Sequence, residues 1–544
     1  MADILLIQPP IRDFYLTSKR TIPYGLACIA ASIISNGFTV EIFDALSTSK
    51  SKIIDYPKEF EYLKPFYKNS DISPFGLFHK FKHFGYSFEH IGNIAKKSQS
   101  FLIGISSLFT PYSDEAIITA EYIKKFYPTC KIVLGGHHPT SLPLSVINSN
   151  AVDFVLRGEG ETSMPLLAKA VKENEGFEKI PGIVFKRQDG TIYISKSSSM
   201  DNIDGFPLPA INLINNNFYK RGNAGSTVII TGRGCPLKCT YCSVNSSEIP
   251  YRKRSVDSVI KEMDIAITKF NARFIDFEDE NLSFQKNWFL ELLEKIKKNF
   301  CGYNLELRAM NGLYPPAIDE EIIQKMKETG FKTVNLSLGT TCKDQLKKWN
   351  RKDVSGSLDN CLELAEKYGL DAVCYIIVGA PFQNWKDSIS DMIFLAQRRT
   401  LLGVSVFYPS PGSKDYDLCE DSKLLPEKFS MMRSSALPLS KSRLESITLL
   451  RLSRIINFMK FLVDIEDPLY SKCQTFKISK DKIEIGKKLI DLFFKDGNIR
   501  GINKDGEIYS QLISKEVTNT FINSLINIQL SGIISEKYVI KSEL

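Results

Sequence analysis

The chain has 544 residues, of which 43% are apolar, and its formal net charge is +8. This length exceeds what one hydrophobic core usually serves, so we expect two or three domains. The charge comes mainly from scattered lysines, which favours a solvated surface over a nucleic-acid or anionic-lipid footprint, and we expect no nucleic-acid partner.

The sequence pattern indicates neither a membrane-spanning segment nor a secretion signal. No apolar run approaches the roughly 20 residues that span a bilayer. The nearest run, PYGLACIAASIIS at residues 23–35, has helical periodicity. The eleven cysteines are an odd number and are widely spread apart from three near residue 240. We therefore expect a protein of the reducing cytoplasm without a transmembrane segment.

The first 200 residues alternate between strand and helix signals. Strands are predicted at residues 4–10, 38–46, 101–107, 131–136 and 152–158, with helices at 24–37 and 114–128. Apolar strands separated by amphipathic helices predict a parallel, doubly wound, Rossmann-like α/β sheet. An insertion at about residues 49–98 is rich in Phe, Tyr and Lys, and we interpret it as a capping subdomain.

Small residues gather where these strands end. In open parallel sheets a ligand binds outside the carboxyl ends of the strands, and short side chains let backbone amides approach it. The candidates for such a site are Ser106, Ser107, Gly135, Gly136, Gly158 and Gly160.

A second alternating series fills residues 201–419. Six strands are predicted, at residues 227–234, 273–279, 304–310, 332–339, 371–379 and 403–411. Helices between them start near Ser255, Asn287, Asp319, Val354 and Asn384. This pattern predicts an incomplete parallel barrel, whose active residues would collect at the carboxyl ends of the strands. Residues 420–544 form a third unit, with a long helix at 443–463 and a hairpin turned at Lys504, Asp505 and Gly506.

Three cysteines, Cys235, Cys239 and Cys242, follow the first strand of this series in TGRGCPLKCTYCS. A structural zinc site wants four ligands, so zinc would have to recruit Cys301, Cys374 or an N-terminal histidine. A disulfide would join two of the three thiols and leave the third unpaired. An iron-sulfur cluster held by three thiolates leaves one iron open, and an open position implies a small-molecule ligand.

The CxxxCxxC spacing, with Tyr241 before the last cysteine and a six-unit barrel around it, resembles the radical SAM superfamily. The resemblance implies a 4Fe-4S cluster that binds S-adenosylmethionine (SAM) and cleaves it to a 5′-deoxyadenosyl radical. It also implies that Asp279 or Glu280 meets the ammonium of SAM and that Arg308 meets its carboxylate. Each of these three has a plain structural alternative. Gly339 stands where relatives often have a ribose-binding Glu, which weakens that part of the resemblance.

Other motifs fit this family only in part. Gln383 stands in place of the acid of a GxPxE turn, and we interpret that turn as structural. The basic segment YRKRS, Tyr251 to Ser255, is open to two interpretations, an anion site or a solvated helix entrance.

The N-terminal segments PYGLACIAASI, GISSLFTPYSDEA, VLGGHHPT and VDFVLRGEGE are similar, in this order, to the cobalamin-binding subclass of radical SAM enzymes. This resemblance implies a corrin between the sheet and the barrel. The six strand-end residues named earlier, together with His137 and Glu159, would lie near it. No histidine has Asp two positions before it, so the DxHxxG signature of a lower cobalt ligand is absent. His137 and His138 approach the ligand or are held by hydrogen bonds.

The resemblance favours methylation of an unactivated carbon through methylcobalamin and a 5′-deoxyadenosyl radical. The alternatives are a ring-forming oxidative cyclase and a binding module with a degenerate centre. An external electron donor such as flavodoxin or ferredoxin is implied. The aromatic insertion and the apolar C-terminal helices suit a bulky, apolar small-molecule substrate such as a lipid or a tetrapyrrole, and they equally suit packing within a core.

Overall fold

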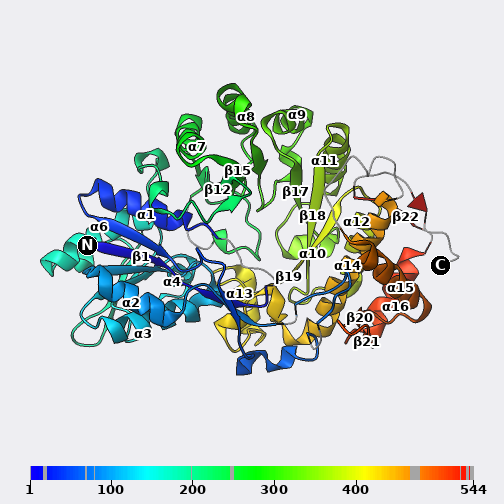
Figure 1. The fold of residues 1–544 in the computed structure, drawn as a ribbon, viewed down its shortest axis with the longest axis horizontal. Helices are drawn as coiled ribbons and strands as arrows, with labels where there is room; N and C mark the ends of the chain where they lie inside the picture. Colours follow the sequence, from blue (N-terminus) through cyan, green and yellow to red (C-terminus); the bar gives the residue numbers. More distant parts are fainter. Residues whose placement is uncertain are drawn as a thin grey trace.

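The structure is a computed structural model that describes residues 2–15, 21–67, 70–78, 80–197, 199–245, 250–465, 478–526, 528–533 and 538–539. Along the chain it places an N-terminal sheet, a central series of parallel strands and a C-terminal group of helices, from left to right in Figure 1. Among the described residues no helix is long and apolar enough to cross a bilayer.

The N-terminal sheet contains the predicted parallel strands in the order β8-β7-β6-β1-β3. Its strands and helices are β1 (Ile4–Gln8), α1 (Tyr24–Ser35), β3 (Val40–Asp44), α2 (Phe88–Ser98), β6 (Leu102–Ser106), α3 (Ser113–Phe126), β7 (Lys131–Gly135), α4 (His137–Ser141), α5 (Pro143–Ile147), β8 (Phe154–Leu156) and α6 (Gly160–Glu173). Helices α2 and α3 cover one face and α1 and α6 the other, each over its own apolar core. The doubly wound sheet is therefore confirmed. Two antiparallel edge strands that we did not predict, β9 (Ile183–Lys186) and β10 (Ile192–Ile194), extend it.

The insertion differs from the predicted capping subdomain. Its last part is α2, which packs on the N-terminal sheet. Its strands β4 (Ser51–Ile53) and β5 (Lys82–Phe84) form a small antiparallel sheet with β2 (Ile11–Asp13), in the order β2-β5-β4. Its aromatic side chains Phe60, Phe75 and Phe81 are buried in the same core as the central strands and the C-terminal helices. In Figure 1 this blue segment runs beneath the central strands toward α14. The insertion thus joins the two halves of the molecule.

The central series holds the six predicted parallel strands. They belong to two sheets, β12-β15-β16, edged by β11 (Lys220–Arg221), and β17-β18-β19, which two isolated parallel bridges join at Leu307–Phe331 and Leu313–Leu336. The elements are β12 (Ala224–Ile229), α7 (Val256–Phe270), β15 (Ala272–Phe277), α8 (Lys286–Phe300), β16 (Glu306–Arg308), α9 (Glu320–Thr329), β17 (Thr333–Gly339), α10 (Lys343–Lys348), α11 (Ser355–Lys367), β18 (Asp371–Val378), α12 (Trp385–Ala396) and β19 (Leu401–Val406). The side chains of Ser255, Asp319 and Asn384 each accept a backbone N–H at the start of a helix, so these predicted helix starts are confirmed.

The C-terminal elements pack onto the central strands. They are α13 (Lys414–Asp421), α14 (Arg443–Ile465), α15 (Lys480–Asp496), β20 (Arg500–Ile502), β21 (Ile508–Ser510), α16 (Lys515–Leu525), β22 (Gln529–Leu530) and β23 (Tyr538–Val539). The hairpin β20-β21 is confirmed, and Gly506 takes the left-handed conformation of its turn at φ +84°. Phe521 and Leu525 of α16 are buried in the shared core. The apolar face of that helix is therefore core and does not support a substrate surface.

Candidate active site

The three cysteines lie on a loop that leaves the carboxyl end of β12. A two-stranded ribbon closes its base, formed by β13 (Gly232–Arg233) and β14 (Arg252–Lys253). A Cβ at Gly232 would lie 2.7 Å from the carbonyl oxygen of Arg252, and Gly234 enters the loop at φ +77°. Both glycines are needed, one for close approach and one for its backbone conformation.

The thiols of this loop are gathered in one partly shielded region. Cys239 is buried, and Cys235 and Cys242 are partly exposed. Burial raises the pKa of Cys235, and it raises the pKa of Cys242 to about 11; the neighbouring thiols add to both shifts. The backbone N–H groups of Leu237 and Val244 act in the opposite direction on Cys235 and Cys242. Cationic iron would supply the positive charge that three adjacent thiolates need, so this donor set fits an iron-sulfur cluster.

The alternative zinc ligands do not join the three thiols. Cys301 is exposed beyond the end of α8, and Cys374 is buried within β18. Within the described ranges no group of three or more Cys, His, Asp or Glu side chains has the arrangement of a single-ion site.

Arg351 supports the loop from the other side and was missed in the sequence. Its guanidinium donates to the hydroxyl of Tyr241 at 3.0 Å and to the backbone oxygen of Ser337 at 2.5 Å, and it lies 3.9 Å from the Cys239 sulfur. The Tyr241 ring packs edge-on against Trp349 at 5.2 Å. Tyr241 is therefore placed beneath the cysteines as a packing residue. An isolated arginine after a helix gives no sequence signal of such a role.

The predicted SAM residues occupy different environments. Asp279 is buried, and its carboxylate accepts from the Thr231 hydroxyl at 2.6 Å, the Thr231 N–H at 3.0 Å and the Lys253 ammonium at 3.1 Å. It holds the ribbon in place, and its carboxylate oxygens are already engaged by Thr231 and Lys253. Glu280 is exposed at the surface of the loop, but desolvation of its carboxyl group and the neighbouring Asp279 raise its pKa to about 7, and the carboxylate lies within electrostatic range of Cys235.

Arg308 lies at the end of β16, as predicted, and is partly exposed. Its nearest acid is Asp276, with Nε 3.9 Å from a carboxylate oxygen, a loose contact that leaves N–H groups for another anion. Gly339 ends β17 at φ +81°, and a Cβ there would lie 3.1 Å from the Arg351 guanidinium. Arg351 thus fills the space beside Gly339.

The turn after β18 is structural, as predicted. The side-chain oxygen of Gln383 accepts from the N–H of Ala380 at 3.0 Å, and its amide nitrogen donates to the carbonyl of Ile377 at 2.9 Å. These two bonds close the turn, and they hold Phe382 at φ +57°, which a non-glycine residue rarely adopts.

At the carboxyl edge of the N-terminal sheet, Ser106 and Ser107 line a pocket. Its other lining residues are Gln8, Pro9, Pro10, Ile11, Thr21, Leu46, Leu108, Phe109 and Tyr112. The Ser107 hydroxyl is buried and makes no hydrogen bond within the described structure. An unpartnered buried hydroxyl at a strand end fits a bound ligand with polar groups.

The glycines at this edge serve two purposes. Gly136, at φ +118°, lets the chain pass over the carbonyl of Ser107, where a Cβ would come within 2.6 Å. Gly135 ends β7 beside it and Gly158 follows β8 at φ +80°, so both leave their strand ends open. Gly160 starts α6 and faces Ile29 of α1, where a Cβ would lie 2.9 Å from the side chain. Gly160 is therefore a helix-packing residue.

The two adjacent histidines are unlike each other. His138 is buried, and its ring nitrogens lie 3.3 Å from the Thr110 hydroxyl and 3.2 Å from the Ser145 hydroxyl. It is the histidine held by hydrogen bonds, and burial lowers its pKa to about 4. His137 is the exposed one and starts α4 at the carboxyl end of β7.

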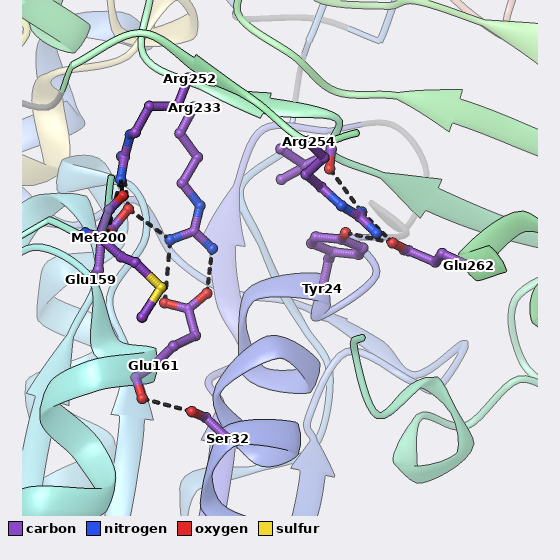
Figure 2. Close-up of polar contacts among 10 residues, drawn as sticks. Tyr24, Ser32, Glu159, Glu161, Met200, Arg233, Arg252, Arg254 and Glu262 are labelled. Carbon is purple, nitrogen blue, oxygen red and sulfur yellow. Dashed lines mark hydrogen bonds and ion pairs between the residues drawn. The ribbon is translucent and has the colours of Figure 1, made fainter. Parts of the chain in front are cut away.

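Glu159, which the sequence places near the corrin, has its carboxylate engaged by groups of the protein. It is buried and accepts from Arg233 at 2.9 Å and Arg252 at 2.8 Å, the two arginines of the ribbon, and from the Met200 N–H at 2.8 Å. Glu161 pairs with the same Arg233. Figure 2 shows these two carboxylates, from the start of α6, meeting arginines that flank the cysteine loop.

The basic segment at Tyr251–Ser255 follows neither of the two interpretations. Figure 2 shows Arg252 with Glu159, and Arg254 with the buried Glu262, which also accepts from the hydroxyl of Tyr24. Lys253 pairs with Asp279. The segment neutralises internal carboxylates from both halves of the molecule, so it is neither an anion site nor a solvated entrance.

The comparisons with known proteins agree with this architecture. Residues 229–395 match the radical SAM superfamily, and residues 79–168 match the B12 binding domain. The chain therefore carries a radical SAM domain and a B12 binding domain, and the cofactors of these domains are a 4Fe-4S cluster with SAM and cobalamin.

Similar proteins include methyltransferases and cyclases. The cytidylyl-2-hydroxyethylphosphonate methyltransferase of Streptomyces wedmorensis is 24% identical, over 72% of this chain and 75% of that protein. The anaerobic magnesium-protoporphyrin IX monomethyl ester cyclase of Rubrivivax gelatinosus is 25% identical, over 51% of each chain. The fold is similar to that of the radical SAM methyltransferase TsrM from Kitasatospora setae, solved with cobalamin and a 4Fe-4S cluster, with a TM-score of 0.58, 16% identity and coverage of 78% and 76%.

Proposed function

We propose that this enzyme transfers a methyl group from SAM to a carbon atom of an apolar small molecule. The observation that carries the proposal is the ribbon contact, in which the B12 binding domain holds both strands that flank the three-cysteine loop. When bound, the cluster supplies the electron that cleaves SAM to a 5′-deoxyadenosyl radical, while cobalamin carries the methyl group. The chain itself fixes the relative positions of the two cofactor sites.

Residue roles follow from the geometry. Cys235, Cys239 and Cys242 would hold the cluster, and Arg351 and Tyr241 would orient their loop. Glu280 and Arg308 would bind the amino and carboxylate groups of SAM. Ser106, Ser107, Gly135, Gly136 and Gly158 would face polar groups of the corrin at the sheet edge, with His137 beside them.

Exposed apolar side chains at the carboxyl ends of the strands support an apolar substrate. Met310 follows β16, Phe382 follows β18 and Tyr408 follows β19, and their side chains are 40%, 65% and 44% exposed. Exposed apolar groups that gather near cofactor sites mark binding surfaces. A lipid or a tetrapyrrole would have the required chemistry.

Product analysis tests the proposal. The protein is reconstituted anaerobically with iron, sulfide and cobalamin, given SAM, dithionite and a cell extract, and analysed by mass spectrometry. We expect S-adenosylhomocysteine and 5′-deoxyadenosine to form together, and Cys235→Ala to lose the cluster absorbance and both products. Deoxyadenosine without S-adenosylhomocysteine would contradict methylation and favour the ring-forming alternative, which the cyclase relative keeps open.

The substrate surface has its own test. Phe382→Ala is expected to raise the KM for the methyl acceptor about tenfold, because a large apolar contact is lost. Leu166→Ala is the matched control, since Leu166 is also an exposed apolar residue but lies on α6. Equal KM values for the two variants would remove Phe382 from the substrate surface.

A further inference from the structure

Three segments that are distant in the sequence meet at the backbone beside Cys239. The N–H of Thr240 donates to the carbonyl of Trp349 at 3.0 Å, and the side chain of Asn350 donates to the carbonyl of Lys238 at 3.0 Å. The N–H of Asp415 donates to the carbonyl of Thr240, also at 3.0 Å. The cysteine loop, the α10 segment and the start of α13 therefore form one continuous surface.

This surface is rich in lysines, and we name it the lysine face. Its six exposed lysines are Lys238, Lys343, Lys347, Lys348, Lys352 and Lys414. The inner side of α10 is buried through Gln345 and Leu346, so its charged residues project outward. Asp344 and Asp353 on the α10 segment and Asp417 in the first turn of α13 are exposed acids among these lysines, while Glu420 and Asp421 lie at the far end of α13. No ion pair in the described part of the chain involves any of the six lysines, in contrast to the basic residues of the ribbon.

The lysine face is separated from the cysteines by a thin layer of packed side chains. Trp349 is 1% exposed and its ring lies 5.2 Å from the ring of Tyr241. Arg351, from the same segment, reaches the Cys239 sulfur at 3.9 Å. Cys239 itself is only 8% exposed, so solvent has little direct access to it. A partner on this face would come close to the cluster ligands without entering the substrate side.

We propose that the lysine face is the docking surface for a small acidic protein that delivers single electrons to the cluster. The inference rests on the proposed function, because reductive cleavage of SAM consumes one electron each time. The flavin or iron-sulfur centre of the donor loses one electron and the cluster gains it, with no other reactant. Lysines without internal counter-ions attract an acidic partner and accelerate its encounter, and this attraction weakens with salt.

The test compares two charge-reversal variants of the whole protein. One is the triple variant K347E, K348E and K352E on the lysine face. The other is the matched control K480E, K482E and K488E, which reverses exposed lysines on α15, at the C-terminal end of the molecule. Each is loaded with the cluster and mixed anaerobically with photoreduced flavodoxin, an acidic one-electron donor. The rate of loss of cluster absorbance is measured in about 20 mM and about 300 mM salt.

We expect flavodoxin to reduce the lysine-face variant at least about tenfold more slowly than the wild type in low salt, with rates that converge in high salt. The control variant should stay within about twofold of the wild type. Dithionite should reduce all three proteins equally, which shows that the cluster is intact. An unchanged rate in the lysine-face variant, or equal slowing in the control, would overturn the proposal.

A failure of the docking proposal can be distinguished from a failure of the proposed function. Cleavage of SAM by dithionite-reduced wild type tests the function and needs no partner protein. If that reaction fails while the charge reversal still slows reduction by flavodoxin, the docking surface stands and the function falls. If SAM is cleaved and the charge reversal has no effect, the function stands and the docking surface falls.

Discussion

Two of the contacts between the N-terminal half and the rest of the molecule have opposite chemistry. In the first, which we call the apolar joint, Phe14, Phe60 and Phe81 pack together, and Phe75 lies edge-on to Phe458 of α14 at 5.4 Å. The second, the ionic joint, consists of Glu159 and Glu161 with Arg233 and Arg252. One is a set of rings in a shared core, and the other is a set of paired charges.

The two joints therefore have different tasks: the apolar joint attaches the two halves to each other, and the ionic joint aligns them. Burial of apolar surface is strong and non-directional, so the apolar joint holds the halves together without fixing fine geometry. Hydrogen bonds between carboxylate and guanidinium groups are directional, so a displacement of either group weakens them. Because a buried ion pair adds little net stability, its use at the base of the cysteine loop points to positioning.

The largest expected effect comes from breaking the apolar joint. Phe60→Ala should lower the free energy of unfolding by about 3 to 5 kcal/mol, because Phe60 is 1% exposed and its removal leaves a cavity. Urea unfolding followed by circular dichroism measures the change. Ile53→Ala is the control, since Ile53 lies on the same insertion but is 55% exposed, and it should change little. A loss below about 1 kcal/mol for Phe60→Ala would mean that the insertion is not part of the core.

Breaking the ionic joint should cost less stability and more function. Glu159→Gln should lower the free energy of unfolding by about 2 kcal/mol, because the nearly buried Arg252 loses its counter-charge. The yield of S-adenosylhomocysteine per deoxyadenosine should shift, since the cofactor sites would no longer be aligned. Glu178→Gln is the matched control, because the Glu178–Arg187 pair is solvent-exposed and far from the loop. Equal product ratios in both variants would remove the positioning role.

The sequence predicted the main strands and helices of both halves, but neither the ribbon nor the contacts of the two joints. The alternation of strands and helices and the helix starts near Ser255 and Asp319 are local signals, and the structure confirms them. The ribbon strands have two residues each, too short for a periodic pattern. Arg252 and Glu159 are 93 positions apart in the sequence. A basic segment has the same local pattern whether it faces solvent, binds an anion or pairs with a buried acid, so the sequence does not show which of these occurs.

The aromatic insertion was misjudged for a similar reason. A cluster of Phe and Tyr is expected both in a capping subdomain and in a shared core, and only the tertiary structure shows that Phe60 and Phe75 enter the core beside α14. The cysteine loop was accessible because its spacing is itself the chemical signal. Arg351 was not, because its partners Ser337 and Tyr241 come from other elements.

The two joints should also differ in their response to pH. Burial raises the pKa of Glu159, but hydrogen bonds from Arg252 and the Met200 N–H and the charge of Arg233 outweigh it, so the pKa lies below the usual 4.5. A lowered carboxyl pKa contributes stability above pH 4.5 that is lost as the pH falls through the folded value. The cost of Glu159→Gln should therefore be full at pH 7 and shrink below pH 4.5, whereas the cost of Phe60→Ala should stay constant. Unfolding titrations at several pH values measure both, and parallel curves would contradict the assignment.

The smallest expected effect is the coupling between the joints. Phe60 and Glu159 share no partner, since one packs among rings of the insertion and the other binds arginines of the ribbon. If each substitution acts locally, the free-energy changes of the double variant should add within about 0.5 kcal/mol. Either joint alone keeps the partners of the other joint close together, at high effective concentration. If the loss of both joints lets the N-terminal sheet separate as a unit, the free energy of unfolding of the double variant should therefore fall by more than the sum of the two single changes. We expect additivity, because the linking chain and the Arg433–Asp13 pair, at 3.0 Å, still hold the sheet. A double-mutant cycle in urea decides between these outcomes, and an excess loss would show that alignment and attachment are not independent.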